Sequence, residues 1–279
     1  MKKQKIKISG GKIKLSNFDA SYSEGFKDKK DVSEKIAKNL KVMTKLQDVL
    51  YAHDKYSILL ILQSMDAGGK DGTIRQIMSG VNPQGCQVFS FKKPSDEELD
   101  HDYFWRIHKS LPERGRIGIF NRSYYEEILV AKVHPEILQK QKLPNELINK
   151  DVWTLRFKQI NDFERYLFEN GTITLKFFLY ISKDEQKARF LSRLQDPTKN
   201  WKLSKPDIAE RAHWDKYMDA FEDMVNNTSS RIAPWDIVPS NKKWYRNYVI
   251  SQTIANTMKS LDMSYPKLTD ESLVNLKID

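Results

Sequence analysis

The sequence is poor in the residues that form disulfides or bind zinc, and it lacks long apolar segments. Its 279 residues include one cysteine, Cys86, and five histidines. One cysteine cannot form an intramolecular disulfide, which indicates a reducing, cytoplasmic location, and the scattered histidines have no zinc-type spacing. The longest apolar runs, at 58–62 and 177–181, are far too short to cross a bilayer. A disulfide scaffold is therefore excluded, and neither a zinc site nor a membrane partner is expected.

Flexible linkers and internal repeats are also missing. No Pro/Gly/Ser-rich stretch divides the chain, so we expect a single domain at 31–279 behind a lysine-rich arm at 1–30 that has little regular structure. Aromatic residues make up 11% of the sequence, which argues against disorder because disordered chains contain few of them.

Positive charge is what the sequence has in excess. Lys and Arg number 47 against 37 Asp and Glu, which gives a formal net charge of +10. Such a charge attracts nucleic acid, acidic membranes, phosphorylated metabolites and inorganic polyanions alike, or it simply keeps the protein soluble. The positions of the charges must decide among these partners.

Short apolar runs alternate with helical patterns along the chain. The run at 57–62 is typical of a strand that is buried on both faces of a parallel sheet. Further strands are predicted at 86–91, 117–120, 172–181 and 237–238. Strands that alternate with helices indicate an α/β fold.

Helices are predicted between these strands. The capping-box pattern Ser-x-x-Glu opens one helix at 95–110 and another from 182 onwards. In the helix predicted at 204–225 we expect Ile208, Ala212, Tyr217, Phe221 and Met224 to face the core. The remaining helices are predicted at 32–52, 145–169 and 204–225.

A glycine-rich turn follows the first buried strand, and an apolar helix comes directly after it. Glycines let backbone N–H groups converge on an anion, the helix N-terminus adds its positive end, and Lys70 supplies a mobile charge. Taken alone, Gly68-Gly69-Lys70 is also compatible with an ordinary tight turn. In this context we expect a phosphate-binding loop, and its candidate residues are Asp66, Ala67, Gly68, Gly69, Lys70, Asp71, Gly72 and Thr73.

The loop departs from the full phosphate-loop pattern, G-x-x-x-x-G-K-S/T, at two positions. Ser64 stands where the first glycine belongs, and Asp71 replaces the Ser/Thr whose hydroxyl helps to hold magnesium. A carboxylate inside a phosphate loop repels an anion unless a metal lies between them. Asp66 is therefore the predicted metal ligand, and Mg²⁺ is the predicted cofactor.

A second polar cluster follows the strand at 117–120. Phosphate-loop enzymes normally deliver a carboxylate to the metal from this strand end, but here the tip residue is the neutral Asn121. Arg122 is placed to neutralise a transferring phosphoryl group, and Glu126 to orient a second substrate or a metal-bound water. The structural alternative is a surface salt bridge between Arg122 and Glu126.

With both clusters in view, the chain resembles the polyphosphate kinase 2 family. The resemblance rests on the segments 65–74, 101–108 and 111–126, and the segments 156–164 and 233–239 also fit. It implies a P-loop kinase-like, three-layer αβα fold with a central, mostly parallel sheet and a flexible helical lid. It also implies Mg²⁺-dependent phosphoryl transfer between inorganic polyphosphate and a nucleotide, and a homo-oligomer, either a dimer or a tetramer.

The resemblance extends to single residues. Asp66 and Lys70 match the loop carboxylate and the phosphate-binding lysine of the family, and Arg122 matches its second-motif arginine. Asn121 departs from members that have Asp there. The form Asn-Arg-Ser-Tyr-Tyr-Glu resembles the class III subgroup, which accepts nucleoside mono- and diphosphates. The expected partners are thus polyphosphate and AMP, ADP or ATP, with GMP and GDP as further candidates and no nucleic acid.

Basic residues concentrate at about 183–216, where we expect the lid. Arg189 and Arg193 are four apart on a predicted helix, so both project from one face. Guanidinium groups match phosphate oxygens in forked pairs, so these two arginines can hold a phosphate chain or stabilise charge during transfer. The alternative is a solvated helix face. The basic residues at 242–246 either extend this groove or decorate the surface.

Two rival functions stay open beside a polyphosphate-dependent nucleotide kinase. An ATP-dependent nucleoside or nucleotide kinase uses the same loop but has no need of an extended basic lid. A non-catalytic polyanion or nucleic-acid binding protein explains the basic arm but not Asp66. In the leading hypothesis Arg122, with Arg189 or Arg193, neutralises the transition state, because phosphoryl transfer depends on positioning and charge neutralisation.

Overall fold

The computed structural model describes residue 4 and residues 6–268, and its centre is one six-stranded sheet. The strand order is β1-β6-β5-β2-β4-β3, and neighbouring strands are parallel except for the antiparallel pair β1–β6. The strands are β1 (Lys7–Ile8), β2 (Ser57–Gln63), β3 (Cys86–Ser90), β4 (Ile117–Asn121), β5 (Thr172–Tyr180) and β6 (Trp235–Pro239). The predicted α/β fold with a mostly parallel sheet is confirmed.

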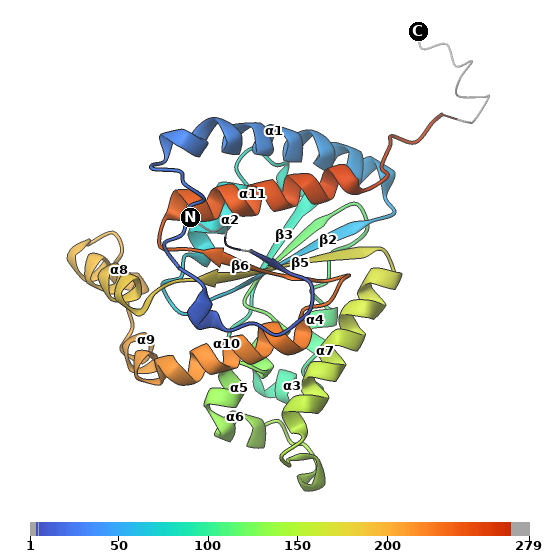
Figure 1. The fold of residues 1–279 in the computed structure, drawn as a ribbon. Helices are drawn as coiled ribbons and strands as arrows, with labels where there is room; N and C mark the ends of the chain where they lie inside the picture. The colour runs from blue at the N-terminus through green and yellow to red at the C-terminus, as the bar shows by residue number, and fades with distance from the viewer. Residues whose placement is uncertain (1–3, 5, 269–279) are drawn as a thin grey trace.

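Helices cover both faces of the sheet, which gives the three-layer architecture (Figure 1). One face packs against α1 (Lys30–His53), α2 (Lys70–Ile77) and α11 (Lys243–Ser260). The other carries α7 (Val152–Glu169) and α10 (Trp214–Thr228), with shorter helices beside them. These shorter helices are α3 (Asp96–Leu99), α4 (Trp105–His108), α5 (Val130–Val133) and α6 (Pro135–Gln139).

A projection beyond the sheet is formed by α8 (Lys183–Gln195) and α9 (Lys205–Glu210) in the region of the expected lid (Figure 1). Short 3-10 helices connect the main elements. They are η1 (Leu15–Asn17), η2 (Pro83–Gly85), η3 (Tyr124–Glu127), η4 (Asn145–Leu147), η5 (Asn200–Lys202) and η6 (Arg211–His213).

Strand β2 runs through the middle of the sheet, and all seven of its residues are buried. Alternate side chains point to opposite faces of a strand, so Ile58 and Leu60 join one core while Leu59 and Ile61 join the other. Burying one such aliphatic side chain contributes roughly 1.5–3 kcal/mol, which explains the unbroken apolar run. Two cores therefore hold β2 in place.

The helix at 95–110 is shorter than predicted. Its capping box forms as expected, with the Ser95 side chain accepting from the Glu98 N–H, but α3 ends at Leu99. The Asp102 carboxylate then accepts the Phe104 N–H at 2.8 Å, which starts a separate turn before α4. At α8 the corresponding Ser182 cap also forms.

The helix predicted at 204–225 is divided into α9, η6 and α10. The prediction that Ile208 and Ala212 face the core is wrong, because both are exposed and Ile208 keeps 51% of its surface. At the division the Arg211 side chain donates to the Lys183 carbonyl oxygen at 2.6 Å, which ties this turn to α8.

The N-terminal arm packs against the domain. Strand β1 pairs with β6, and Ile8, Leu15 and Ala20 are buried. Apart from β1 and η1, the described part of the arm is irregular, as expected.

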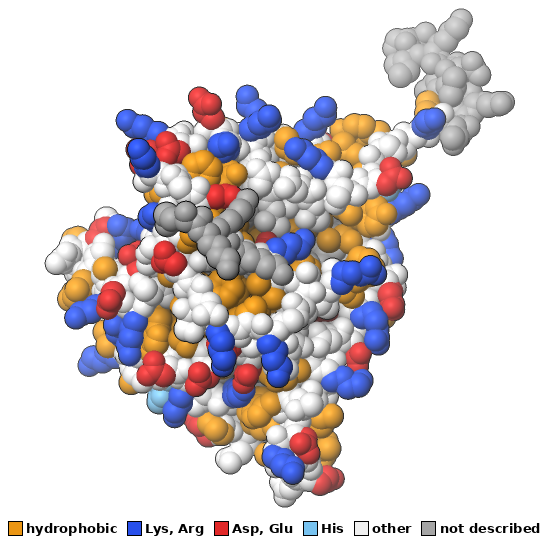
Figure 2. Space-filling model, in the orientation of Figure 1, with side chains coloured by type: hydrophobic (Ala, Val, Ile, Leu, Met, Phe, Trp, Pro, Cys, Tyr) orange, Lys and Arg blue, Asp and Glu red, His pale blue; other side chains and the backbone are white. Residues whose placement is uncertain are grey.

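Within the described residues, no helix has the length and apolar character that a membrane crossing requires. Positive and negative side chains are interspersed over the face shown in Figure 2, so the described part of this face does not gather the excess charge into one patch.

Candidate active site at the carboxyl ends of β2 and β4

The phosphate-loop segment and the second polar cluster lie side by side. Strands β2 and β4 are parallel neighbours, and Leu62 pairs in register with Asn121, so both strands end at the same edge of the sheet. A cavity of about 700 Å³ opens there. It is lined by Asp66, Ala67, Gly68, Gly69, Lys70, Asp71, Gly72, Ser90, Phe91, Lys92, Asn121, Arg122, Arg193, Trp201 and Lys202. Of the loop residues predicted to bind phosphate, only Thr73 is outside this lining, and it is buried in α2.

The loop has a backbone shape that few sequences adopt. Ala67 and Gly69 both have positive φ, +60° and +102°, and α2 begins at Lys70 directly after them. A Cβ at Gly69 would lie 2.0 Å from Nη1 of Arg246, so the position requires glycine on two grounds. The N-terminus of α2 thus faces the cavity, as phosphate binding requires.

Lys70 is held by the residue that replaces the first glycine of the motif. Its Nζ atom donates to the carbonyl oxygen and to the hydroxyl of Ser64, both at 3.1 Å. Burial, with the nearby charge of Arg122, lowers the pKa of Lys70. The same hydroxyl lies 2.2 Å from the place of a Cβ at Gly68, so a side chain at position 68 would collide with Ser64.

Arg122 bridges the two loops. Its Nη2 atom donates to Oδ1 of Asp66 at 2.9 Å, so its ion pair is with Asp66 and not with Glu126, the partner of the structural alternative. Arg122 has a φ of +65°, a conformation that costs a non-glycine residue roughly 1–3 kcal/mol and persists only where its surroundings hold it. Burial raises the pKa of Glu126, although the positive charges of Arg122 and Lys70 oppose this shift.

Asn121 reaches across to the phosphate loop. Its Nδ2 atom donates to Oδ1 of Asp71 at 3.0 Å, and Nζ of Lys202 lies 3.4 Å from Oδ2 of Asp71. Burial alone would raise the pKa of Asp71, but the hydrogen bond from Asn121 and the charge of Lys202 lower it. The Oδ1 atom of Asn121 is buried and has no hydrogen-bond partner among the described residues.

These oxygen atoms decide whether the site suits a metal. Among the described residues, no group of three or more His, Cys, Asp or Glu side chains is arranged to hold a metal ion by itself. Magnesium, however, is usually held by one or two carboxylates together with phosphate oxygens and waters. The carboxylates of Asp66 and Asp71 and the unpartnered oxygen of Asn121 fit that mode of binding.

The two arginines predicted for the lid lie differently. Arg189 is buried, and its guanidinium donates to the carbonyl oxygen of Ala67 at 2.8 Å, to the carbonyl oxygen of Ser240 and to Glu185. Arg193 lines the cavity and donates to the Lys202 carbonyl oxygen at 3.1 Å. Arg189 therefore braces the phosphate loop, whereas Arg193 borders the space above it.

Several contributors were not singled out from the sequence. Gln186 donates to the carbonyl oxygen of Asp66 at 3.0 Å, and Trp201, which is 77% exposed, lines the cavity with Lys202. Arg246 is buried behind the loop, so the idea that it decorates the surface is wrong. Burial, with the neighbouring Arg189, lowers the pKa of Arg246 to about 10. The position of Gln186, one turn before residue 189 on the same helix, is the signal that could have marked it.

A second cavity, of about 200 Å³, lies beyond Arg122. Apolar side chains, including Leu99, Val130 and Ile137, form much of its wall, and Glu126 and Arg106 are among its charged residues. Arg122 lines both cavities. The site thus has two compartments that share Arg122, Phe91 and Lys92 in their walls.

Comparison with known proteins gives consistent results. The family model described as "Polyphosphate kinase 2 (PPK2)" matches residues 26–266. The chain is 49% identical over 261 residues to the ADP-polyphosphate phosphotransferase of Rhodopseudomonas palustris, which covers 93% of this chain and 90% of that protein. It is 42% identical over 268 residues to the AMP/ADP-polyphosphate phosphotransferase of Meiothermus ruber, which covers 96% of each. The crystal structure of polyphosphate kinase 2 from Arthrobacter aurescens TC1 superimposes with a TM-score of 0.88 at 38% identity, covering 96% of this chain and 93% of that one.

Proposed function

Because the chain belongs to the polyphosphate kinase 2 family, we propose that it transfers a phosphoryl group between inorganic polyphosphate and AMP or ADP in the presence of Mg²⁺. The observation that carries this proposal is the position of Arg122 between the two cavities. A phosphotransferase must bring the phosphates of two substrates together, and this arrangement supplies one compartment for each.

The larger cavity suits a phosphate chain. The N-terminus of α2 and Lys70 line it, together with Arg193 and Lys202 from the lid region. The smaller cavity, with its apolar wall, suits the nucleoside part of a nucleotide. Under this assignment the phosphates of the nucleotide point towards Arg122.

The chemistry that these residues must supply is mainly electrostatic. Lys70 and the loop N–H groups hold donor phosphates, and Arg122 neutralises the charge that builds up on the transferring group. The acceptor is itself a phosphate and is already ionised, so no strong base is needed, and Asp66 orients it. Mg²⁺ would be held by Asp66, with Asp71 and Asn121 beside it, and when bound it neutralises phosphate charge.

We further propose that both AMP and ADP are substrates. The relative from Meiothermus ruber is named for both nucleotides, and the one from Rhodopseudomonas palustris for ADP. The homo-oligomer and the cytoplasmic location remain predictions, which light scattering and cell fractionation test.

The deciding experiment gives the purified protein a single phosphoryl donor. With Mg²⁺ and AMP or ADP, product is expected from polyphosphate, and the Lys70→Ala variant controls for contaminating kinases. Product from ATP but not from polyphosphate would instead identify an ATP-dependent kinase. Transfer from neither donor, together with tight and salt-sensitive DNA binding, would identify a polyanion-binding protein.

A further inference from the structure

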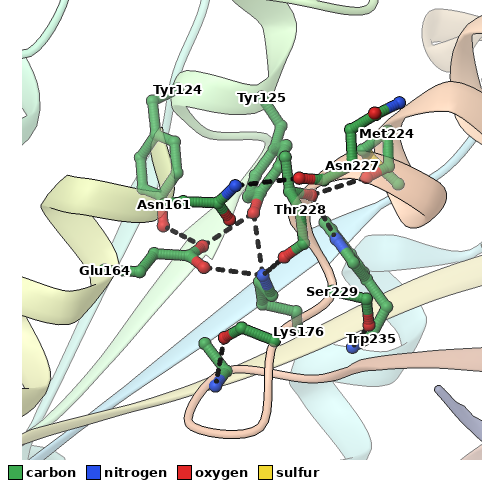
Figure 3. A network of polar contacts seen from close by, with 12 residues as sticks. Tyr124, Tyr125, Asn161, Glu164, Lys176, Met224, Asn227, Thr228, Ser229 and Trp235 are labelled. Carbon is green, nitrogen blue, oxygen red and sulfur yellow. Dashed lines mark hydrogen bonds and ion pairs between the residues drawn. The ribbon is translucent and has the colours of Figure 1, made fainter. Parts of the chain in front are cut away.

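A charged pair lies inside the apolar core on the α7 side of the sheet. Nζ of Lys176 on β5 is 2.6 Å from Oε2 of Glu164 on α7, and the two side chains are 0% and 1% exposed (Figure 3). Removing two charges from water is costly, so a buried ion pair is weak evidence for a role in stability alone. The pair calls for another explanation.

Both charged groups are fully hydrogen-bonded. The three protons of the Lys176 ammonium are donated to Glu164, to the Tyr125 hydroxyl at 2.9 Å and to the Thr228 carbonyl oxygen at 2.7 Å. The other carboxylate oxygen of Glu164, Oε1, accepts from the hydroxyls of Tyr124 at 2.8 Å and Tyr125 at 2.7 Å (Figure 3). The hydroxyls of both tyrosines are therefore hydrogen-bonded to this one ion pair.

The same two tyrosines lie within the second active-site loop. They begin the 3-10 turn η3, directly after Arg122 and Ser123 and directly before Glu126. Arg122 holds a φ of +65°, which its own conformational preference does not favour. Something outside the loop must fix this shape, and the Tyr124 and Tyr125 side chains are its anchors in the core.

We propose that Glu164 and Lys176 are positioning residues for phosphoryl transfer, a role that rests on the proposed function. Through the hydroxyls of Tyr124 and Tyr125 they fix the turn that aims Arg122 at Asp66 and into both cavities. Apolar packing alone would let the turn shift, whereas three directional hydrogen bonds between the two tyrosine hydroxyls and the charged pair define one arrangement. A misplacement of about 1 Å in such a group can lower turnover by a factor on the order of 100.

The test removes one hydroxyl at a time. Tyr124→Phe and Tyr125→Phe each keep the ring and lose the contact with Glu164. We expect each to lower kcat by roughly 10-fold or more, with little change in the KM for polyphosphate. Ile254→Val, in the opposite core, lowers stability without touching the turn and serves as the stability control. Glu164→Gln should lower kcat in the same way. If this variant does not fold, the two tyrosine variants are sufficient for the test.

A double-mutant cycle separates positioning from simple loss of stability. If Tyr125 acts through Arg122, then Tyr125→Phe should change kcat by less than about 2-fold in an Arg122→Ala background. Independent, additive losses would overturn the proposal, as would a kcat no lower than that of Ile254→Val. A wild-type protein without polyphosphate-dependent activity would refute the proposed function instead.

A structural readout does not depend on activity. In a crystal structure of the Tyr124→Phe/Tyr125→Phe double variant, we expect Arg122 to leave Asp66. An Arg122–Asp66 distance unchanged from 2.9 Å would overturn the positioning role whatever the enzyme does.

Discussion

The guanidinium group of Arg122 lies 2.9 Å from the Asp66 carboxylate and so ties the loop after β4 to the phosphate loop. Both side chains keep some access to solvent, 41% for Arg122 and 25% for Asp66. Such a partly exposed ion pair contributes little to the free energy of folding. Phosphate and metal can therefore replace the contact between the two side chains at low cost. The pair therefore links the two loops without blocking substrate.

Changing either charged group of the phosphate loop should abolish most of the activity. Asp66→Asn and Lys70→Ala are each expected to lower kcat by roughly 10²–10³-fold, since each removes a group aimed at the reacting phosphates. Steady-state kinetics measures this, and circular dichroism checks the fold. Lys158→Ala, an exposed position on α7, is the control. Near-normal turnover in both site variants would refute the assignment.

Asn121→Asp should make stability depend on magnesium. The new carboxylate would face Asp71, whose Oδ1 atom is now 3.0 Å from the Asn121 amide, and like charges this close repel. We expect the metal-free variant to lose about 1–3 kcal/mol of unfolding free energy and to regain much of it when Mg²⁺ is added. Thermal unfolding with and without Mg²⁺ measures this. Asn121→Ala loses the same hydrogen bond without adding charge, so an equal magnesium response in both variants would argue against the explanation.

Two glycines of the phosphate loop should respond in opposite ways to alanine. Gly69→Ala places a Cβ against Arg246 in a backbone conformation that alanine avoids, so we expect a loss of more than about 1 kcal/mol. At Gly72, within α2, the nearest atom to a Cβ is 3.7 Å away, and Gly72→Ala should gain about 0.5–1 kcal/mol from helix propensity. Urea unfolding compares the two. A change of the same sign in the unfolding free energy of both variants would contradict this explanation.

Asp236 should make the protein more stable as the pH falls towards 4. Burial raises its pKa from 3.8 to about 6, and its Oδ1 atom has no hydrogen-bond partner among the described residues. Above pH 6 the buried charge therefore destabilises the fold, and this penalty is relieved as the pH falls from about 6 through 3.8. Asp236→Asn should stabilise the protein at pH 8 by up to about 3 kcal/mol and much less at pH 4. Unfolding at several pH values measures the difference, with the exposed Asp215→Asn as control. A gain independent of pH would contradict this cause.

Salt should weaken the binding of long polyphosphate more than the binding of AMP or ADP. A long chain meets more of the basic groups around the large cavity, including Arg193 and Lys202, than a single nucleotide does. Raising KCl from about 50 to about 500 mM should therefore increase the Kd of long polyphosphate several-fold more than that of AMP. Isothermal titration calorimetry at both salt concentrations tests this, and equal effects on both ligands would argue against an extended polyanion site.

The parts of the site that follow from local pattern were predictable. Asp66, Lys70 and Arg122 come directly after apolar strands, and parallel strands bring such loops to one edge. Arg246 was not predictable in its role, because its guanidinium reaches the loop only through the packing of α11, far along the chain. Lys176 was missed because the partner that allows its buried charge, Glu164, lies on a helix.

Helix continuity was the weakest part of the sequence prediction. Nothing in the residues at 204–225 marks a break, and at the break Arg211 contacts Lys183, which lies on another element. The amphipathic pattern holds only within α10, where Tyr217, Phe221 and Met224 are buried.

The pairing of β1 with β6 has a consequence for how the protein is made. Lys7 lies opposite Asp236, so the first strand of the sheet has its partner only after almost the whole chain has left the ribosome. At roughly 5–20 residues per second the lysine-rich start waits on the order of ten seconds or more for that strand. Docking of β1 therefore closes this sheet edge late in biogenesis, and until β6 has been made the segment that forms β1 has no strand to pair with.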